Sequence, residues 1–166
     1  MKTSIKGREI HRQAEKAREF KQDFLGSLNL IDKAILAYQK DGDSKGISEA
    51  LQSRSSAFKH LYQKTKDKTF LVLAEYSALV GLKIAEGLHN PTALVMPFRG
   101  LGKIYETAKK YKKASEYFAK AVKAFTENPP PENNRPAVVA DMKTHQFACE
   151  YLSGNKGAYP KLLSAI

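Results

Sequence analysis

The sequence predicts an all-helical protein built from antiparallel helical hairpins. Apolar residues recur three and four positions apart along most of the chain, which is the period of an amphipathic helix. Turn-forming residues divide these segments into four pairs, and no stretch shows the apolar-polar alternation of a strand. We therefore expect about eight helices in one domain that forms a right-handed superhelical stack. The hairpins lie at approximately 7–40, 46–89, 92–127 and 137–166, within a domain of residues 1–166.

The first hairpin, at 7–40, has the weakest pattern. Its first helix carries a modest apolar stripe from Ile10 to Phe20, and its second helix places Ala34 four residues before Tyr38. Such a stripe suits a partner helix within the protein better than a membrane surface. Lys21 stands where the third hairpin has a glycine, so the pattern alone leaves the register of this hairpin open.

The segment 41–46, Asp-Gly-Asp-Ser-Lys-Gly, breaks the helical period. Its two aspartates and its final glycine occupy the first, third and sixth positions of a calcium-binding loop. However, Lys45 stands where a fifth-position oxygen ligand is needed, and Gln52 replaces the terminal bidentate glutamate. We therefore interpret the segment as a turn that ends in a helix N-cap.

The second hairpin, at 46–89, is long. Its first helix has Ser55 as a small residue on its apolar face, and its second helix, 70–88, is apolar on most sides. We expect this second helix to be the most buried in the protein. Asn90 and Pro91 then favour a new helix start, as N-cap and first helical residue.

The third hairpin carries the clearest motif. Its first helix has an apolar face that includes a glycine, and its second helix has a small-large-small stripe: Phe98, Leu101, Gly102 and Tyr105, then Ala114, Phe118 and Ala121. Gly102 leaves room for the second helix to approach closely. This spacing resembles the signature of the tetratricopeptide repeat. The resemblance implies neighbouring hairpins on both sides and a protein that displays binding surfaces rather than performing chemistry.

The fourth hairpin follows a proline-rich connector at 129–136. Ala148 precedes Tyr151 by three residues, which repeats the glycine-to-tyrosine spacing of the third hairpin. The closing segment 159–166 is long enough for only a short helix. Its apolar residues either cap the stack or dock on another copy of the protein, so a homo-oligomer through this helix is one expectation: Leu162, Leu163 and Ile166.

The charge balance bounds the partner classes. With 28 Lys and Arg against 17 Asp and Glu, the formal net charge is +11. This charge is consistent with acidic peptides, nucleic acid or anionic lipid surfaces as partners. The alternative is that the lysines are solvated and serve solubility alone. The single cysteine, Cys149, excludes an internal disulfide and fits a reducing cytoplasm. Because no apolar run approaches the roughly 20 residues of a membrane-spanning helix, we expect a cytoplasmic protein without membrane insertion.

The sequence offers little material for catalysis. It contains no glycine-rich phosphate loop, zinc-ligand cluster or nucleophile motif. His145 and Cys149 lie four residues apart and share a helix face, but no nearby third ligand completes a metal site. We expect a non-enzymatic protein with no cofactor and no metal.

The resemblance places the partner-binding surface on the first helix of each hairpin. The face turned away from the second helix carries Arg18, Gln22, Gln52, Ser56, Lys59, Arg99, Lys103, Glu106, Met142 and His145. Arginine offers a carboxylate a bidentate fork and lysine a point charge, so we expect a scaffold that binds an acidic or mixed peptide or protein in a mostly basic concave groove. Some tetratricopeptide proteins clamp acidic C-terminal tails with Lys, Asn and Arg. This chain has no Asn at the expected place, so the clamp is not carried over.

A nucleic-acid-associated helical-repeat protein is the alternative. It is motivated by the net charge of +11 and by the run Lys109-Lys110-Tyr111-Lys112-Lys113 between the two helices of the third hairpin. Tyr111 also fits the packing of the repeat, and solvated lysines are ordinary on a tight turn. The run alone therefore does not decide between the two functions.

Overall fold

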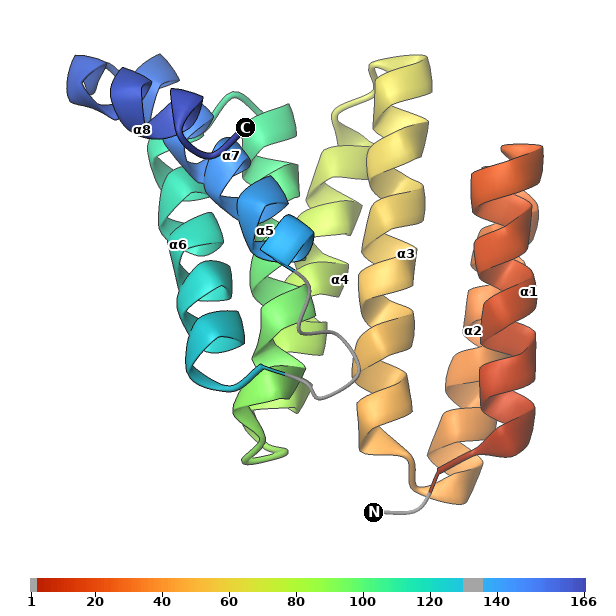
Figure 1. The fold of residues 1–166 in the computed structure, drawn as a ribbon. Coiled ribbons are helices and arrows are strands. Elements are labelled where there is room, and N and C mark those ends of the chain that lie inside the picture. Colours follow the sequence, from red (N-terminus) through yellow and green to blue (C-terminus); the bar gives the residue numbers. More distant parts are fainter. Residues whose placement is uncertain (1–2, 130–135) are drawn as a thin grey trace. The chain divides into compact units, whose positions relative to one another are not determined.

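The computed structural model describes residues 3–129 and 136–166 and is all-helical, as the sequence predicts. The described residues form eight α-helices and no strand (Figure 1). They fall into two compact units, Met1–His89 and Asn90–Ile166, and each unit has its own core. The sequence pattern indicates one domain, so periodicity does not reveal this division. The connector predicted at 129–136 lies largely outside the described residues.

Unit 1, Met1–His89, consists of two helical hairpins. The first pairs α1, Ile5–Lys21, with α2, Phe24–Asp41, and the second pairs α3, Ser44–Thr65, with α4, Thr69–Glu86. α2 also packs on α3. Three of the four helices begin at a side chain that accepts a hydrogen bond from a backbone N–H of the first turn, namely Ser4, Asp23 and Asp43.

The turn predicted within 41–46 is present but consists of Gly42 and Asp43 alone, and Asp43 is the N-cap of α3. Gly42 ends α2 with a φ of 70°, which a glycine adopts without strain. One carboxylate oxygen of Asp43 accepts the N–H of Gly46 at 2.8 Å, and the other accepts the N–H of Ser4 at 3.0 Å. Both oxygens therefore serve helix ends, which explains why this aspartate stands here without a calcium loop.

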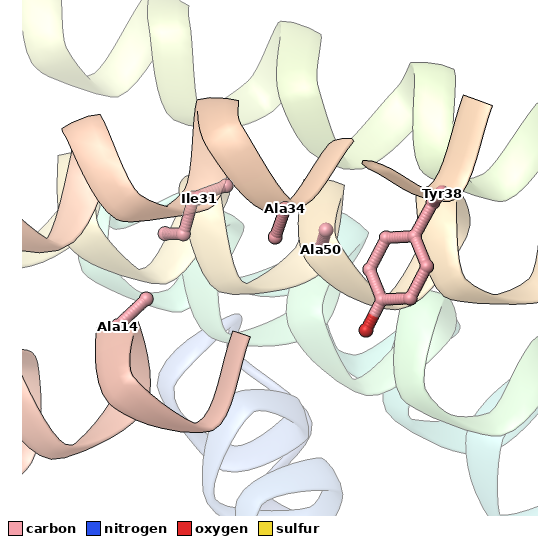
Figure 2. Close-up of a cluster of buried hydrophobic side chains, with 5 residues drawn as sticks. All are labelled: Ala14, Ile31, Ala34, Tyr38 and Ala50. Atoms are coloured by element: carbon pink, nitrogen blue, oxygen red, sulfur yellow. The ribbon is translucent and has the colours of Figure 1, made fainter. Parts of the chain in front are cut away.

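Small residues bring the helices of unit 1 close together. The centre of its core consists of Ala14 from α1, Ile31, Ala34 and Tyr38 from α2, and Ala50 from α3 (Figure 2). The ring of Tyr38 lies beside two glycines: a Cβ would be 2.6 Å from the ring at Gly7 and 2.4 Å at Gly46. Side chains at these positions would overlap the ring, so both glycines are required by packing.

Gly7, not the position of Lys21, provides the small residue that faces the aromatic of the first hairpin. Helices that meet antiparallel place residues opposite each other when they are equally far from the connection. Tyr38 is 15 residues after Asp23, and Gly7 is 15 residues before Gln22. This pairing gives the register that the sequence leaves open, across helices of 17 and 18 residues.

The expectation that the helix at 70–88 is the most buried is wrong. α4 places Ala74, Ala78 and Ala85 in the core, but Val72 and Tyr76 are about two-thirds exposed. Within unit 1, α4 packs against α3, so only one side of this apolar helix is covered. Among the described helices, none has both the length and the apolar composition that a membrane span requires.

Unit 2 begins with the short 3₁₀ helix η1, Pro91–Leu94, after the predicted N-cap Asn90. It continues with α5, Val95–Thr107, and α6, Tyr111–Glu127, and closes with α7, Pro136–Leu152, the short 3₁₀ helix η3, Lys156–Ala158, and α8, Tyr159–Leu163. α6 packs on both α5 and α7, and the core contains Val95, Ala121, Phe125 and Met142.

The glycine of the clearest motif packs as predicted. A Cβ at Gly102 of α5 would lie 3.0 Å from the ring of Phe118 on α6. Both residues are eight positions from Lys110, at the connection between the two helices. The α5 and α6 hairpin therefore has the close approach that the motif indicates.

Candidate interaction surface on α5 and α7

The first helices of the two hairpins in unit 2, α5 and α7, present a cluster of polar side chains to each other. Nη2 of Arg99 donates to Oδ2 of Asp141 at 2.6 Å. Oε1 of Glu106 lies 2.9 Å from Nδ1 of His145. Lys103 lies one turn from Arg99 on α5, and Cys149 lies one turn from His145 on α7. We name this set the α5–α7 cluster: Arg99, Lys103, Glu106, Asp141, His145 and Cys149.

Opposite charges in the α5–α7 cluster neutralise one another. Burial alone would raise the pKa of Asp141, but the hydrogen bond and charge of Arg99 lower this pKa overall. Burial lowers the pKa of Lys103, and the nearby Arg99 lowers it further, while Asp141 and Glu106 oppose that change. The surface is therefore mixed in charge, and not the mostly basic groove that the sequence predicts.

The buried edge of the cluster holds an aromatic contact and a thiol. The imidazole of His145 stacks on the ring of Phe118, with centroids 5.1 Å apart. Sγ of Cys149 lies 3.7 Å from Oε1 of Glu106 and is fully buried. Burial and the carboxylate of Glu106 raise the pKa of Cys149 to about 12. The thiol therefore stays protonated at neutral pH and is not a nucleophile.

The charged side chains of the cluster remain accessible to a partner. Their exposed fractions run from 29% for Arg99 and Glu106 through 32% for His145 to 40% for Asp141. Nε of Arg99 is buried and has no hydrogen-bond partner among the described residues. The guanidinium is thus fixed in place by one ion pair while part of its hydrogen-bonding capacity is unused.

The sequence predicts four members of this cluster as site residues but does not predict Asp141, which forms the ion pair with Arg99. Arg99, Lys103, Glu106 and His145 are predicted site residues, and the structure brings them together. Asp141 was not predicted, although it lies four residues before His145 and so shares its helix face. Met142 was projected onto the binding face, but it is fully buried in the core of unit 2.

Two predicted site residues of unit 1, Arg18 and Gln52, lie inside the unit. Arg18 is 9% exposed, and its guanidinium donates to the carbonyl of Ser53 at 3.1 Å. Gln52 is 8% exposed, and its amide donates to the carbonyl of Ala78 on α4 at 3.2 Å. Both side chains were predicted on the outer face, but they bond to backbone carbonyls within unit 1.

The other predicted residues of unit 1 lie at its surface. Gln22 is exposed and ends α1 in a left-handed conformation with a φ of 53°. Lys59 and Ser56 are half-buried on α3. Lys59 lies close enough to Glu19 to help lower the pKa of that carboxyl, although the hydrogen bond from Arg18 is the main cause.

A second set of polar residues joins the first helices α1 and α3 of unit 1. The set includes three bonds beyond the one from Arg18 to Ser53: Ser4 to Asp43 at 3.0 Å, Arg8 to Glu49 at 2.9 Å, and His11 Nε2 to Ser53 Oγ at 2.8 Å. The other nitrogen of His11 lies 3.2 Å from the hydroxyl of Tyr38. We name this set the α1–α3 seam: Ser4, Arg8, His11, Arg18, Asp43, Glu49 and Ser53.

Comparison with known proteins supports the fold. The sequence matches no protein-family model and no curated protein. The structure is similar to the crystal structure of BtubC (BKLC) from P. vanneervenii, with a TM-score of 0.76 at 12% sequence identity. The similarity covers 96% of this chain but 60% of that protein, so this chain spans less than two-thirds of its length. At this identity the likeness shows the helical fold alone.

Proposed function

We propose that the chain is a non-enzymatic scaffold that binds an acidic or mixed peptide of a partner protein on the α5–α7 cluster. The observation that supports this proposal is the Arg99–Asp141 ion pair, held at 2.6 Å on a face where both side chains stay partly exposed. Helical-hairpin proteins of the tetratricopeptide type, which the sequence resembles, present such faces on their first helices.

An incoming peptide carboxylate would compete with Asp141 for Arg99. The guanidinium offers a planar fork, and Nη2, which donates to Asp141 at 2.6 Å, is the atom for which a ligand oxygen would compete. Lys103 adds a point charge one turn away. Since Asp141 must be displaced, the surface selects peptides with more than one carboxylate.

The chemistry of the cluster favours binding over catalysis. Cys149 is protonated, because burial and Glu106 raise its pKa to about 12. Among the residues that the structure describes, no group of three or more His, Cys, Asp and Glu side chains is arranged to hold a metal ion. A protonated buried thiol also suits the reducing cytoplasm, which we propose as the compartment.

Nucleic-acid binding is the second candidate function. Lys109, Lys110, Lys112 and Lys113 are all exposed at the connection between α5 and α6, which concentrates positive charge on one edge of unit 2. Lys113 also lies 4.1 Å from the ring centroid of Tyr105, an arrangement that combines cations with aromatic surface. This patch is separate from the α5–α7 cluster in sequence and in charge.

Paired variants separate the two functions. The double variant Arg99→Gln with Lys103→Gln removes two positive charges from the cluster, and Lys112→Gln with Lys113→Gln removes the same charge from the connection. Fluorescence anisotropy is measured with a labelled 12-residue peptide of Asp, Glu, Ser and Pro, and with a labelled single-stranded oligonucleotide. We expect the first pair to weaken peptide binding by about tenfold or more, and the second pair to leave it within about twofold.

The outcome that contradicts the scaffold proposal is equally specific. The nucleic-acid function holds instead if only the oligonucleotide binds and its affinity falls steeply as salt increases. In that case the double variant Lys112→Gln with Lys113→Gln abolishes oligonucleotide binding. Circular dichroism spectra of all variants control for folding.

We also propose self-association through α8, since Leu163 and Ile166 are 58% and 89% exposed. Sedimentation velocity of Leu163→Gln tests it.

A further inference from the structure

A second candidate binding surface lies on the first hairpin of unit 1. A groove of about 560 Å³ between α1 and α2 combines apolar residues with charged ones. Its lining consists of Ile10, Leu36 and Ala37 together with Lys6, Lys33, Lys40 and Asp41. We name it the α1–α2 groove. Leu36 is 65% exposed, although it is a large apolar side chain in a position that a polar residue could fill.

We propose that the α1–α2 groove binds an acidic amphipathic helix of a partner protein. This goes beyond the proposed function, because the groove belongs to unit 1 and shares no residue with the α5–α7 cluster. The partner helix would place apolar side chains against Leu36 and Ile10 and its carboxylates against the lysines.

The spacing of the groove residues matches a helix. Lys33, Leu36 and Lys40 follow one another at three and four residues on α2, so they lie on one helix face. The two lysines are therefore separated by about 10.5 Å along the axis, at 1.5 Å per residue. A partner helix with carboxylates seven residues apart and apolar residues between them has the same spacing. Lys6 and Ile10, four residues apart on α1, repeat the pairing of a cation with an apolar residue.

The charges of the groove favour an acidic occupant. Three lysines face one aspartate, and none of the three forms an ion pair with another residue that the structure describes. A second copy of this chain would bring a net charge of +11, which opposes association through a basic face. A fatty acid carries a single carboxylate and would leave two of the lysines unmatched. A helix with several carboxylates fits all three.

The test uses a synthetic helical peptide and the full chain. The probe is an 18-residue labelled peptide of Glu, Leu and Ala, with Leu at positions i, i+3, i+4 and i+7 and Glu flanking them. We expect it to bind, and we expect Lys33→Glu with Lys40→Glu to weaken its binding by about tenfold or more. The control is Lys64→Glu with Lys68→Glu, which changes the charge of unit 1 equally at exposed positions outside the groove.

A matched apolar pair tests the groove itself. Leu36 and Leu25 are both on α2 and are 65% and 69% exposed, but only Leu36 lines the groove. Leu36→Gln should lower the affinity for the peptide severalfold, whereas Leu25→Gln should leave that affinity unchanged. Equal affinity for Leu36→Gln and the parent chain overturns the proposal, as does binding of a long-chain fatty acid in the groove without any binding of the peptide. Arg99→Gln with Lys103→Gln leaves this probe bound, so failure here and failure of the α5–α7 proposal are distinguishable.

Discussion

The α1–α3 seam and the α5–α7 cluster join equivalent helices but differ in the burial of their aspartate and histidine side chains. In the seam, Ser4 and Asp43 are 39 residues apart, and His11 and Ser53 are 42 apart. In the cluster, the bonded residues Glu106 and His145 are 39 apart, and Arg99 and Asp141 are 42 apart. Both units therefore repeat their first helices after about 40 residues, which is longer than the roughly 34 residues of a tetratricopeptide repeat.

The difference in burial distinguishes a structural role for the seam from the binding role that we propose for the cluster. Asp43 and His11 of the seam are 2% and 7% exposed, while Asp141 and His145 of the cluster are 40% and 32% exposed. Buried polar groups lose their hydrogen bonds at a high free-energy cost, so the seam fixes α1 on α3. Partly exposed ion pairs cost little to break, so the cluster can exchange its partners.

The largest expected effect is the loss of the aspartate in the seam. Asp43→Ala removes the N-cap of α3, leaves the N–H of Ser4 without its partner and removes the 3.7 Å ion pair with Arg8, which keeps its bond to Glu49. We expect the free energy of unfolding to fall by about 2–4 kcal/mol. Asp141→Ala should lower it by less than about 1 kcal/mol, because its ion pair with Arg99 is partly exposed.

Urea unfolding of the two variants, followed by circular dichroism, measures both free energies. Asp43→Asn is an informative control, since an amide oxygen can still cap α3 but carries no charge. Equal losses for Asp43→Ala and Asp141→Ala would mean that burial does not distinguish the two sets of residues.

The aromatic rings beside the two sets give a second, smaller contrast. Tyr38 lies between Gly7 and Gly46, while Phe118 lies between Gly102 and the imidazole of His145. A Cβ at Gly46 would be 2.4 Å from the ring of Tyr38, so Gly46→Ala should cost about 1–3 kcal/mol. A Cβ at Gly102 would be 3.0 Å from its ring, so Gly102→Ala should stay within about 1 kcal/mol of the parent.

Thermal unfolding checks this contrast. Gly102→Leu should lower the melting temperature, because a large side chain there costs roughly 1–3 kcal/mol through overpacking. If Gly102→Leu melts with the parent, the α5 and α6 hairpin does not have the close approach that the glycine indicates. If Gly46→Ala melts at the same temperature as the parent, Tyr38 has room to move that the structure does not show.

The sequence predicts the helices better than it predicts their faces. Turn residues and N-caps are local, so the sequence finds the N-cap Asn90 of η1 and the turn before α3. It does not find Asp23, the N-cap of α2. The face that a helix presents depends on its packing within the whole unit, and Arg18 and Gln52 lie inside unit 1, where they bond to backbone carbonyls. The sequence finds four members of the α5–α7 cluster because Gly102, which packs against Phe118, fixes the face of α5 that turns toward α6.

The smallest expected effect is the dependence of stability on pH. Burial lowers the pKa of His11, and the nearby Arg18 and Arg8 lower it further against the opposing charges of Glu15 and Glu49. The unfolded chain binds a proton at this residue near pH 6.5, while the folded seam keeps the imidazole neutral at that pH. Stability from His11 is therefore fully present above about pH 6.5, and it is lost as the pH falls from there toward the lowered pKa of the folded state.

The free energy of unfolding should accordingly decrease between about pH 7.5 and pH 5.5, and His11→Gln should make that decrease shallower. Burial also lowers the pKa of His60, so His60→Gln is the control that removes a second, separate contribution of the same sign. Urea titrations at three pH values give the slopes. An unchanged slope in His11→Gln would show that the imidazole already accepts a proton in the folded seam. The seam would then be as open to water as the α5–α7 cluster, and burial would no longer explain why one set holds the fold while the other is available to a partner.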